Sequence, residues 1–216
     1  MGNFHENLIA LDDAGTLDGL FARRVRRSPD RDAYRYYDKH SKQWLSYSWA
    51  EMAREVARWQ TAMRGERAPR GGRVAIQLRN CPEWVMFDQA ALSVGLVTVP
   101  LYTDDRPDNI AYILKEADVN ILLVQDAGRW RRLAEVVSHD GPLKRILLLD
   151  DGEAARRLAA EDDRISIVSD WLPERTGELT MRESADGNAL ASSVYTSGTT
   201  GRPKGVVVSH RNLRAG

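Results

Sequence analysis

Between residues 73 and 150, short runs of Val, Ile and Leu alternate with longer amphipathic stretches. The short runs are RVAIQL (73–78), LVTVPLY (96–102), NILLV (120–124) and KRILLLD (144–150). Runs of this length and composition predict strands that are buried on both faces. Because strands that alternate with helices are typical of parallel sheets, we predict an α/β fold with a mostly parallel sheet flanked by helices.

Local signals place the helices of this region. Pro82 suits the first turn of a helix and Gly95 suits a helix C-terminus, so these residues bound one predicted helix. Two further helices are predicted over PDNIAYILKEA (107–117) and from Trp130 to Val137.

The first 72 residues predict two helices and a β-hairpin. Thr16 to Arg27 has apolar residues on one helical face and arginines on the other. AYRYY (33–37) and QWLSY (43–47) flank a polar segment, which indicates a hairpin. Ser48 and Glu51 have the spacing of a capping box. The helix that follows has one apolar face, formed by Met52, Val56, Trp59 and Met63.

Residues 151–190 are more polar than the preceding region, and residues 191–216 again contain apolar runs typical of strands. Residues 151–190 predict a surface helix, a short strand near ISIV (165–168) and a connecting loop. ALASSVYTS (189–197) and KGVVVSH (204–210) predict strands on either side of a Gly/Thr-rich loop. A helix is expected after Ser209, which can act as its N-cap.

Composition excludes several classes of function. Lys plus Arg and Asp plus Glu each number 31, so there is no basic field for nucleic-acid binding. The one cysteine, Cys81, excludes an internal disulfide and a multi-cysteine zinc site, and we expect a buried apolar group instead of a nucleophile.

The histidines do not predict a metal site. His5, His40 and His139 lie in polar contexts without companion ligands at metal spacing. His210 is expected to have a structural role, because Ser209 and Asn212 beside it indicate helix capping.

The sequence predicts a cytoplasmic protein. No targeting segment is visible, and the longest apolar run, residues 90–102, is well under the roughly 20 residues that span a bilayer. The arginine-rich stretch FARRVRRSPDR (21–31) favours a solvated helix face. Peripheral contact with acidic lipids, at the inner face of a membrane, remains the alternative.

The segment YTSGTTGRPKG (195–205) predicts a phosphate-binding loop. Its small residues let backbone N–H groups approach an anion closely. Hydroxyl donors come from Ser197, Thr199 and Thr200, around Gly198 and Gly201, and Lys204 adds a mobile positive charge. We expect Arg202 to be solvated and Tyr195 to belong to the core.

The P-loop pattern G-x-x-x-x-G-K-[ST] does not fit this segment. Arg202 and Pro203 separate Gly201 from Lys204, and Gly205 stands where a hydroxyl residue is required. A strand after the lysine also contradicts the strand–loop–helix context of a P-loop.

The full string YTSGTTGRPKGVVVSHRN (195–212) resembles the signature of the adenylate-forming superfamily, which contains acyl-CoA synthetases, peptide-synthetase adenylation domains and firefly luciferase. Residues 71–124 resemble the N-terminal part of long-chain fatty acyl-CoA synthetases, and the likeness extends from about residue 16 to the end. By this resemblance, the ATP β- and γ-phosphates would contact Thr196, Ser197, Gly198, Thr199, Thr200, Gly201 and Lys204.

The resemblance implies a reaction and its cofactors. In the family, a carboxylate attacks the α-phosphorus of ATP, pyrophosphate leaves, and the acyl-adenylate is captured by the thiol of coenzyme A. ATP, Mg²⁺, coenzyme A and a long-chain fatty acid are therefore the expected small-molecule partners. Lys204 is the candidate for neutralising charge on the departing pyrophosphate.

Several parts of the family's pattern are missing from the sequence. The acyl-pocket segment, the Y-G-x-T-E-type motif, the ribose-binding aspartate, the hinge and the small C-terminal domain with its catalytic lysine have no equivalent. We therefore assign no catalytic residue, expect the chain alone to be inactive, and expect an unpaired sheet edge and an exposed apolar face near residue 216. The expected organisation is one incomplete N-terminal domain made of residues 1–72, 73–150, 151–190 and 191–216.

Two alternatives stay open. The chain could be a non-catalytic nucleotide-binding or split-enzyme module that pairs with another polypeptide carrying the missing half. It could also come from a different adenylate-forming enzyme, such as a peptide-synthetase adenylation domain.

Overall fold

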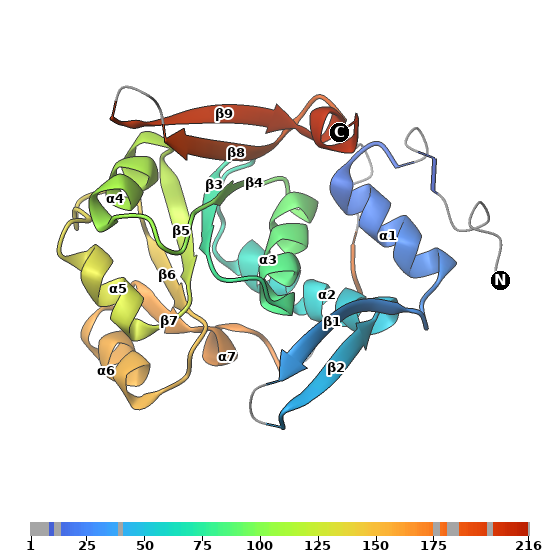
Figure 1. Ribbon diagram of the computed structural model, residues 1–216, viewed down its shortest axis with the longest axis horizontal. Helices are drawn as coiled ribbons and strands as arrows, with labels where there is room; N and C mark the ends of the chain where they lie inside the picture. Colours follow the sequence, from blue (N-terminus) through green and yellow to red (C-terminus); the bar gives the residue numbers. More distant parts are fainter. Residues whose placement is uncertain are drawn as a thin grey trace.

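The computed structural model describes residues 9–10, 14–38, 41–174, 178–180, 186–197 and 201–215 (Figure 1). The helices are α1 (Leu17–Arg27), α2 (Trp49–Gly65), α3 (Pro82–Ser93), α4 (Pro107–Glu116), α5 (Ala127–Ala134), α6 (Glu153–Glu161), α7 (Val168–Trp171) and α8 (His210–Ala215). The strands are β1 (Asp32–Asp38), β2 (Gln43–Ser48), β3 (Arg73–Gln77), β4 (Val97–Pro100), β5 (Val119–Val124), β6 (Arg145–Leu148), β7 (Ile165–Ile167), β8 (Leu190–Ser197) and β9 (Pro203–Ser209).

Seven strands form one sheet in the order β7-β6-β5-β3-β4-β8-β9. Neighbouring strands are parallel except β8 and β9, which form an antiparallel hairpin. The prediction of a mostly parallel α/β sheet is confirmed. Because β4 and β5 lie on opposite sides of β3, the chain changes direction across the sheet at β3, and such switch points place ligand sites at the carboxyl ends of strands.

Helices cover both faces of this sheet. Apolar residues of α4, α5 and α6 pack on one face, and those of α1, α2, α3 and α7 pack on the other (Figure 1). Val74 and Ala75, adjacent in β3, are both fully buried, one in each of these cores. Burial on both sides explains why the strands appear as continuous apolar runs. The predicted hairpin is also present, as a separate two-stranded sheet of β1 and β2.

Side-chain caps set several helix starts. In the predicted capping box, the Ser48 hydroxyl accepts from the Glu51 N–H and the Glu51 carboxylate accepts from the Ser48 N–H at 2.7 Å. The helix predicted from Trp130 begins earlier, at Ala127, because the Asp126 side chain caps it by accepting from the Arg129 N–H at 2.8 Å.

The segment after α6 differs from the prediction. The strand near ISIV ends at Ile167, and Val168 instead begins α7, a four-residue helix that was not predicted. Glu66, just after α2, joins this segment to the sheet. Its Oε1 accepts from Trp171 Nε1 of α7 at 2.7 Å and from Arg145 Nε of β6 at 3.0 Å.

Strand β8 joins the parallel sheet through a single pair of register partners with β4. Thr98 and Ser192 are the register partners. Two hydroxyl groups extend the ladder, since Ser192 Oγ donates to the Thr98 carbonyl at 3.0 Å and Thr98 Oγ1 donates to the Ala191 carbonyl at 3.3 Å.

Strand β9 lies at one edge of the sheet that the structure describes. Val206 and Val207 on it are 56% and 62% exposed, which agrees with the expected edge and exposed apolar surface. The predicted cap of α8 is also present. Ser209 Oγ accepts from the Asn212 N–H at 3.3 Å and donates to Asn212 Oδ1 at 2.7 Å.

In the described part of the chain, no helix has the length and apolar character needed to cross a bilayer.

Candidate functional site

The candidate phosphate loop connects β8 to β9 at the carboxyl end of the parallel strands. In the β8–β9 ladder, Thr196 is the register partner of Lys204, and Tyr195 is the partner of Gly205. Side chains alternate between the two faces of a strand, so Thr196 and Lys204 lie on one face and Tyr195 lies on the other. The exposed hydroxyl of Thr196 and the exposed ammonium of Lys204 are therefore cross-strand neighbours beside the loop.

The described part of the loop contains one glycine with an unusual backbone conformation. Gly201 has φ of 89°, a region that L side chains rarely adopt, so a glycine is required there. Gly198, Thr199 and Thr200 lie outside the described residues, as does the side chain of Ser197. Of the seven residues predicted to contact phosphate, the structure places the side chains of Thr196 and Lys204, together with Gly201.

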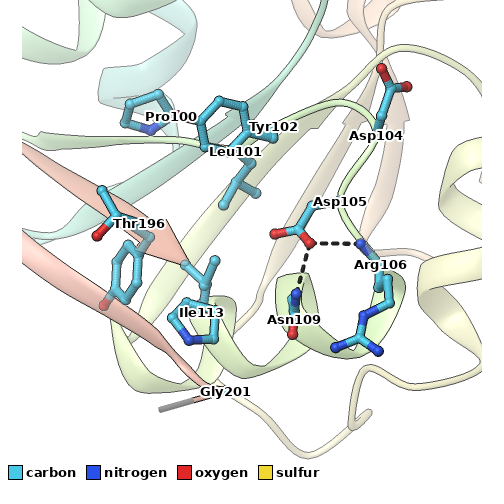
Figure 2. Close-up of a pocket in the computed structure, with 12 residues that line it drawn as sticks. Pro100, Leu101, Tyr102, Asp104, Asp105, Arg106, Asn109, Ile113, Thr196 and Gly201 are labelled. Atoms are coloured by element: carbon cyan, nitrogen blue, oxygen red, sulfur yellow. Dashed lines mark hydrogen bonds between the residues drawn. The ribbon is translucent and has the colours of Figure 1, made fainter. Parts of the chain in front are cut away.

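A cavity of about 480 Å³ borders the base of this loop (Figure 2). One wall comes from the hairpin and the other from the β4–α4 connection and α4. The lining residues are Pro100, Leu101, Tyr102, Asp104, Asp105, Arg106, Asn109, Ile113, Tyr195, Thr196, Gly201 and Pro203. Lys204 is not among them, although its ladder partner Thr196 is.

Hydrogen bonds fix the β4–α4 wall of this cavity. Asp105 Oδ1 accepts from the Arg106 N–H at 2.8 Å and from Asn109 Nδ2 at 2.7 Å, as Figure 2 shows. The Arg129 side chain donates to the Thr103 carbonyl and lies 4.0 Å from an Asp104 carboxylate oxygen. The wall therefore presents carboxylates and one exposed guanidinium, Arg106, in a fixed arrangement.

The residues of the β4–α4 wall were not predicted as site residues from the sequence. The connection follows a predicted strand, which is where ligand sites gather in α/β sheets, and its DDRPDN sequence is strongly polar. These residues could have been singled out as candidates. These residues face the candidate phosphate loop because β4 and β8 are neighbours in the sheet. The sequence does not specify this strand order.

The structure assigns different roles to the residues around Lys204. Tyr195 is 7% exposed and belongs to the core, as predicted. Arg202 was expected to be solvated; it is exposed, but its guanidinium carbon lies 5.4 Å from the centre of the Tyr112 ring on α4. No ion pair involves Lys204 among the described residues, so its charge is available to a ligand.

The remaining candidates have structural surroundings. Burial raises the pKa of Cys81 to about 12, so its thiol stays protonated near neutral pH, consistent with the expectation that it is not a nucleophile. His210 is 1% exposed, and its Nδ1 accepts a hydrogen bond from the Leu17 N–H at 3.2 Å, which supports the expected structural role. His5 and His40 lie outside the described residues. Within the described ranges, no group of three or more His, Cys, Asp or Glu side chains could hold a metal ion.

Comparison with known proteins shows the family. The model of the AMP-binding enzyme family matches residues 21–216. This chain belongs to that family. The resemblance found in the loop sequence is thereby confirmed.

Relatives of this chain are named as CoA ligases for different acids. Long-chain-fatty-acid–CoA ligase 1 from Cavia porcellus is 28% identical over 94% of this chain and 30% of its own length. Crotonobetaine/carnitine–CoA ligase from Salmonella paratyphi A is 30% identical over 78% of this chain and 31% of its own length. The chain therefore spans about a third of the relatives that it matches.

A solved structure shares the fold. The anthranilate–CoA ligase AuaEII, in complex with anthranoyl-AMP, superposes with a TM-score of 0.77 at 18% identity. The match covers 95% of this AMP-binding enzyme chain and 36% of the ligase.

Proposed function

We propose that this chain binds the β- and γ-phosphates of ATP through residues 196–204, as part of an enzyme that activates a carboxylic acid as its adenylate. The observation that carries the proposal is the pairing of Thr196 with Lys204 at the base of the Gly/Thr loop. A hydroxyl donor, a free ammonium group and a left-handed glycine then lie together at the carboxyl end of a parallel sheet.

In this proposal each group has one task. Lys204 holds negative charge on the pyrophosphate as it leaves, and Thr196 donates its hydroxyl proton to a phosphate oxygen. A fixed donor of this kind can contribute roughly 3 to 4 kcal/mol in an enclosed site. Mg²⁺ would accompany the phosphates of ATP, and we assign no residue of this chain as its ligand.

For the acid, we propose a long-chain fatty acid, with coenzyme A as the acceptor of the acyl group. This is supported by the similarity to long-chain-fatty-acid–CoA ligases over 94% of the chain. Other carboxylic acids are the second candidate, since similar proteins are named for crotonobetaine or carnitine and for anthranilate.

We also propose that the arginine-rich stretch of α1 faces solvent instead of a lipid surface. Phe21 and Ala22 of α1 are buried, and the Phe21 ring packs edge-on against Trp49 at 5.8 Å, so the apolar side of the helix is already covered. Sedimentation with anionic liposomes tests this assignment, and salt-sensitive binding of the chain would contradict it.

Isothermal titration with ATP and with AMP tests the phosphate assignment. We expect the chain to bind ATP and to bind AMP more weakly, because AMP lacks the β- and γ-phosphates. Equal affinities, or no binding of ATP, would contradict the assignment.

Pyrophosphate exchange tests the acid. Exchange is measured with palmitate, anthranilate and carnitine on this chain alone and on the chain supplemented with the remaining part of a relative. We expect exchange only in the supplemented sample, and fastest with palmitate. Faster exchange with either of the other acids would favour the second candidate.

A further inference from the structure

Helix α4 contacts the candidate phosphate loop at two points, and both contacts come from the same face of the helix. Tyr112 lies beneath the Arg202 guanidinium, and Glu116 accepts a hydrogen bond from the Tyr195 hydroxyl. Residues four apart on a helix are neighbours on its surface, so Tyr112 and Glu116 form one contact strip. We call the four residues Tyr112, Glu116, Tyr195 and Arg202 the α4 anchor.

The contact between Tyr195 and Glu116 passes beneath β9. Tyr195 and Gly205 are register partners, and a Cβ atom placed on Gly205 would lie 2.8 Å from Tyr195 Cζ and 3.0 Å from its hydroxyl oxygen. The ring therefore occupies the space that a side chain at position 205 would need. From there the hydroxyl reaches the carboxylate of Glu116, the last residue of α4.

The contact between Arg202 and Tyr112 lies just before the start of β9. The Arg202 guanidinium carbon is 5.4 Å from the Tyr112 ring centre, a cation–π geometry. The Arg202 guanidinium is therefore held against α4. Lys204 lies between the two anchored positions, 202 and 205, and its own side chain has no ion pair among the described residues.

We propose that the α4 anchor positions Lys204, and that Tyr195, Glu116 and Arg202 are positioning residues for phosphate binding. The inference rests on the proposed function of the loop. The two cations of the RPK sequence then have different tasks: Arg202 holds the backbone against α4, and Lys204 binds phosphate. Fixing the backbone on both sides of the lysine lowers the entropy that it loses when it binds an anion.

Two measurements on a small set of variants test the inference. Tyr195→Phe removes only the hydroxyl and leaves the ring against Gly205, and Glu116→Ala removes its acceptor. Glu116→Gln keeps an oxygen acceptor and serves as the conservative rescue. Tyr37→Phe, at an exposed tyrosine of β1, is the matched control. The measurements are hydrogen exchange of the Lys204 and Gly205 amides without nucleotide, and the Kd for ATP.

We expect Tyr195→Phe and Glu116→Ala each to speed exchange at these amides and to weaken ATP binding, both by about fivefold to tenfold, the loss expected for one hydrogen bond. The double variant should be no worse than either single variant, because both remove the same interaction. Glu116→Gln and Tyr37→Phe should stay near wild type in both measurements.

Unchanged exchange in Tyr195→Phe, or additive effects of the two substitutions, would overturn the anchor. A fall in thermal stability with an unchanged Kd would show that the contact is only structural, and would also overturn it. Failure of the wild-type chain to bind ATP would instead count against the proposed function, because the exchange measurement needs no nucleotide and tests the contact by itself.

Discussion

The backbone N–H of Leu17 donates a hydrogen bond to Nδ1 of His210, 3.2 Å away and 193 residues later in the chain. This bond satisfies a free N–H at the first turn of α1 with a side chain from the first turn of α8. Arg214 strengthens the same junction, since its Nη1 donates to the Gly15 carbonyl at 2.6 Å. The segment that follows the β8–β9 hairpin is thus held against the beginning of α1.

Replacing His210 by alanine should lower the free energy of unfolding by about 1 to 3 kcal/mol, because the partly buried N–H of Leu17 would lose its acceptor. Urea denaturation measures the change. The matched control is His139→Ala, since His139 is exposed, and it should change stability by less than about 0.5 kcal/mol. Equal effects of the two substitutions would show that the Leu17 contact contributes nothing measurable.

Replacing Lys204 by methionine should weaken ATP binding by about tenfold to a hundredfold, because the loop loses its free cation while the aliphatic part of the side chain is kept. Titration calorimetry with ATP gives the value. Lys144→Met is the control, since Lys144 is exposed beside the amino end of β6, away from the loop. If Lys204→Met binds ATP as tightly as the control, Lys204 is not a phosphate ligand.

Asp88 should make stability depend on pH. Burial raises the pKa of this α3 carboxyl from 3.8 to about 6, against the opposing effect of hydrogen bonds with Thr98 and Gln89. A raised pKa in the folded state favours the protonated form, so this contribution to stability is fully present below pH 3.8 and is lost as the pH rises through 6.

Asp88→Asn should therefore stabilise the protein at pH 8, by roughly 1 to 3 kcal/mol, and should have little effect near pH 3.8. Urea denaturation at the two pH values measures the difference. A stability difference that is the same at both pH values would contradict the assignment of this titration to Asp88.

Glu66→Ala should destabilise the fold by about 2 kcal/mol, because Trp171 Nε1 and Arg145 Nε would lose a shared acceptor. Thermal unfolding followed by Trp fluorescence reports the change. Glu153→Ala provides the comparison, since Glu153 forms an ion pair with Arg157 in which its side chain is 80% exposed. Such surface pairs contribute little, so an equally small effect at Glu66 would contradict the prediction.

The elements predicted from the sequence are those with strong local signals. The apolar runs of β3 to β6, the Ser48–Glu51 box and the Ser209 cap all depend on residues that are close in the chain. Helix α7 was missed because four residues are too few to show a helical period, and the start of α5 was misplaced because the Asp126 cap was overlooked.

The parts of the candidate site that escaped prediction depend on distant pairings. The loop sequence identified the phosphate-binding candidates, but the contact of Arg202 with Tyr112 requires β8 to lie beside β4. Strand order follows from packing across the whole sheet, and no local pattern in the sequence specifies it. The His210–Leu17 bond is of the same kind, because its two partners belong to opposite ends of the chain.

The narrow β4–β8 junction also has a consequence for how the protein folds. Thr98 and Ser192 are joined across 94 residues, whereas β3 to β6 follow one another closely in the chain. Contacts with large sequence separation form late, since the intervening chain must be ordered first. We expect pulse-labelling hydrogen exchange to show protection of β3 and β5 before β8 and β9, and simultaneous protection would contradict this order. The β8–β9 hairpin, which carries the candidate phosphate loop, is then assembled after the centre of the sheet, and any intermediate that stops earlier has the sheet centre without the candidate site.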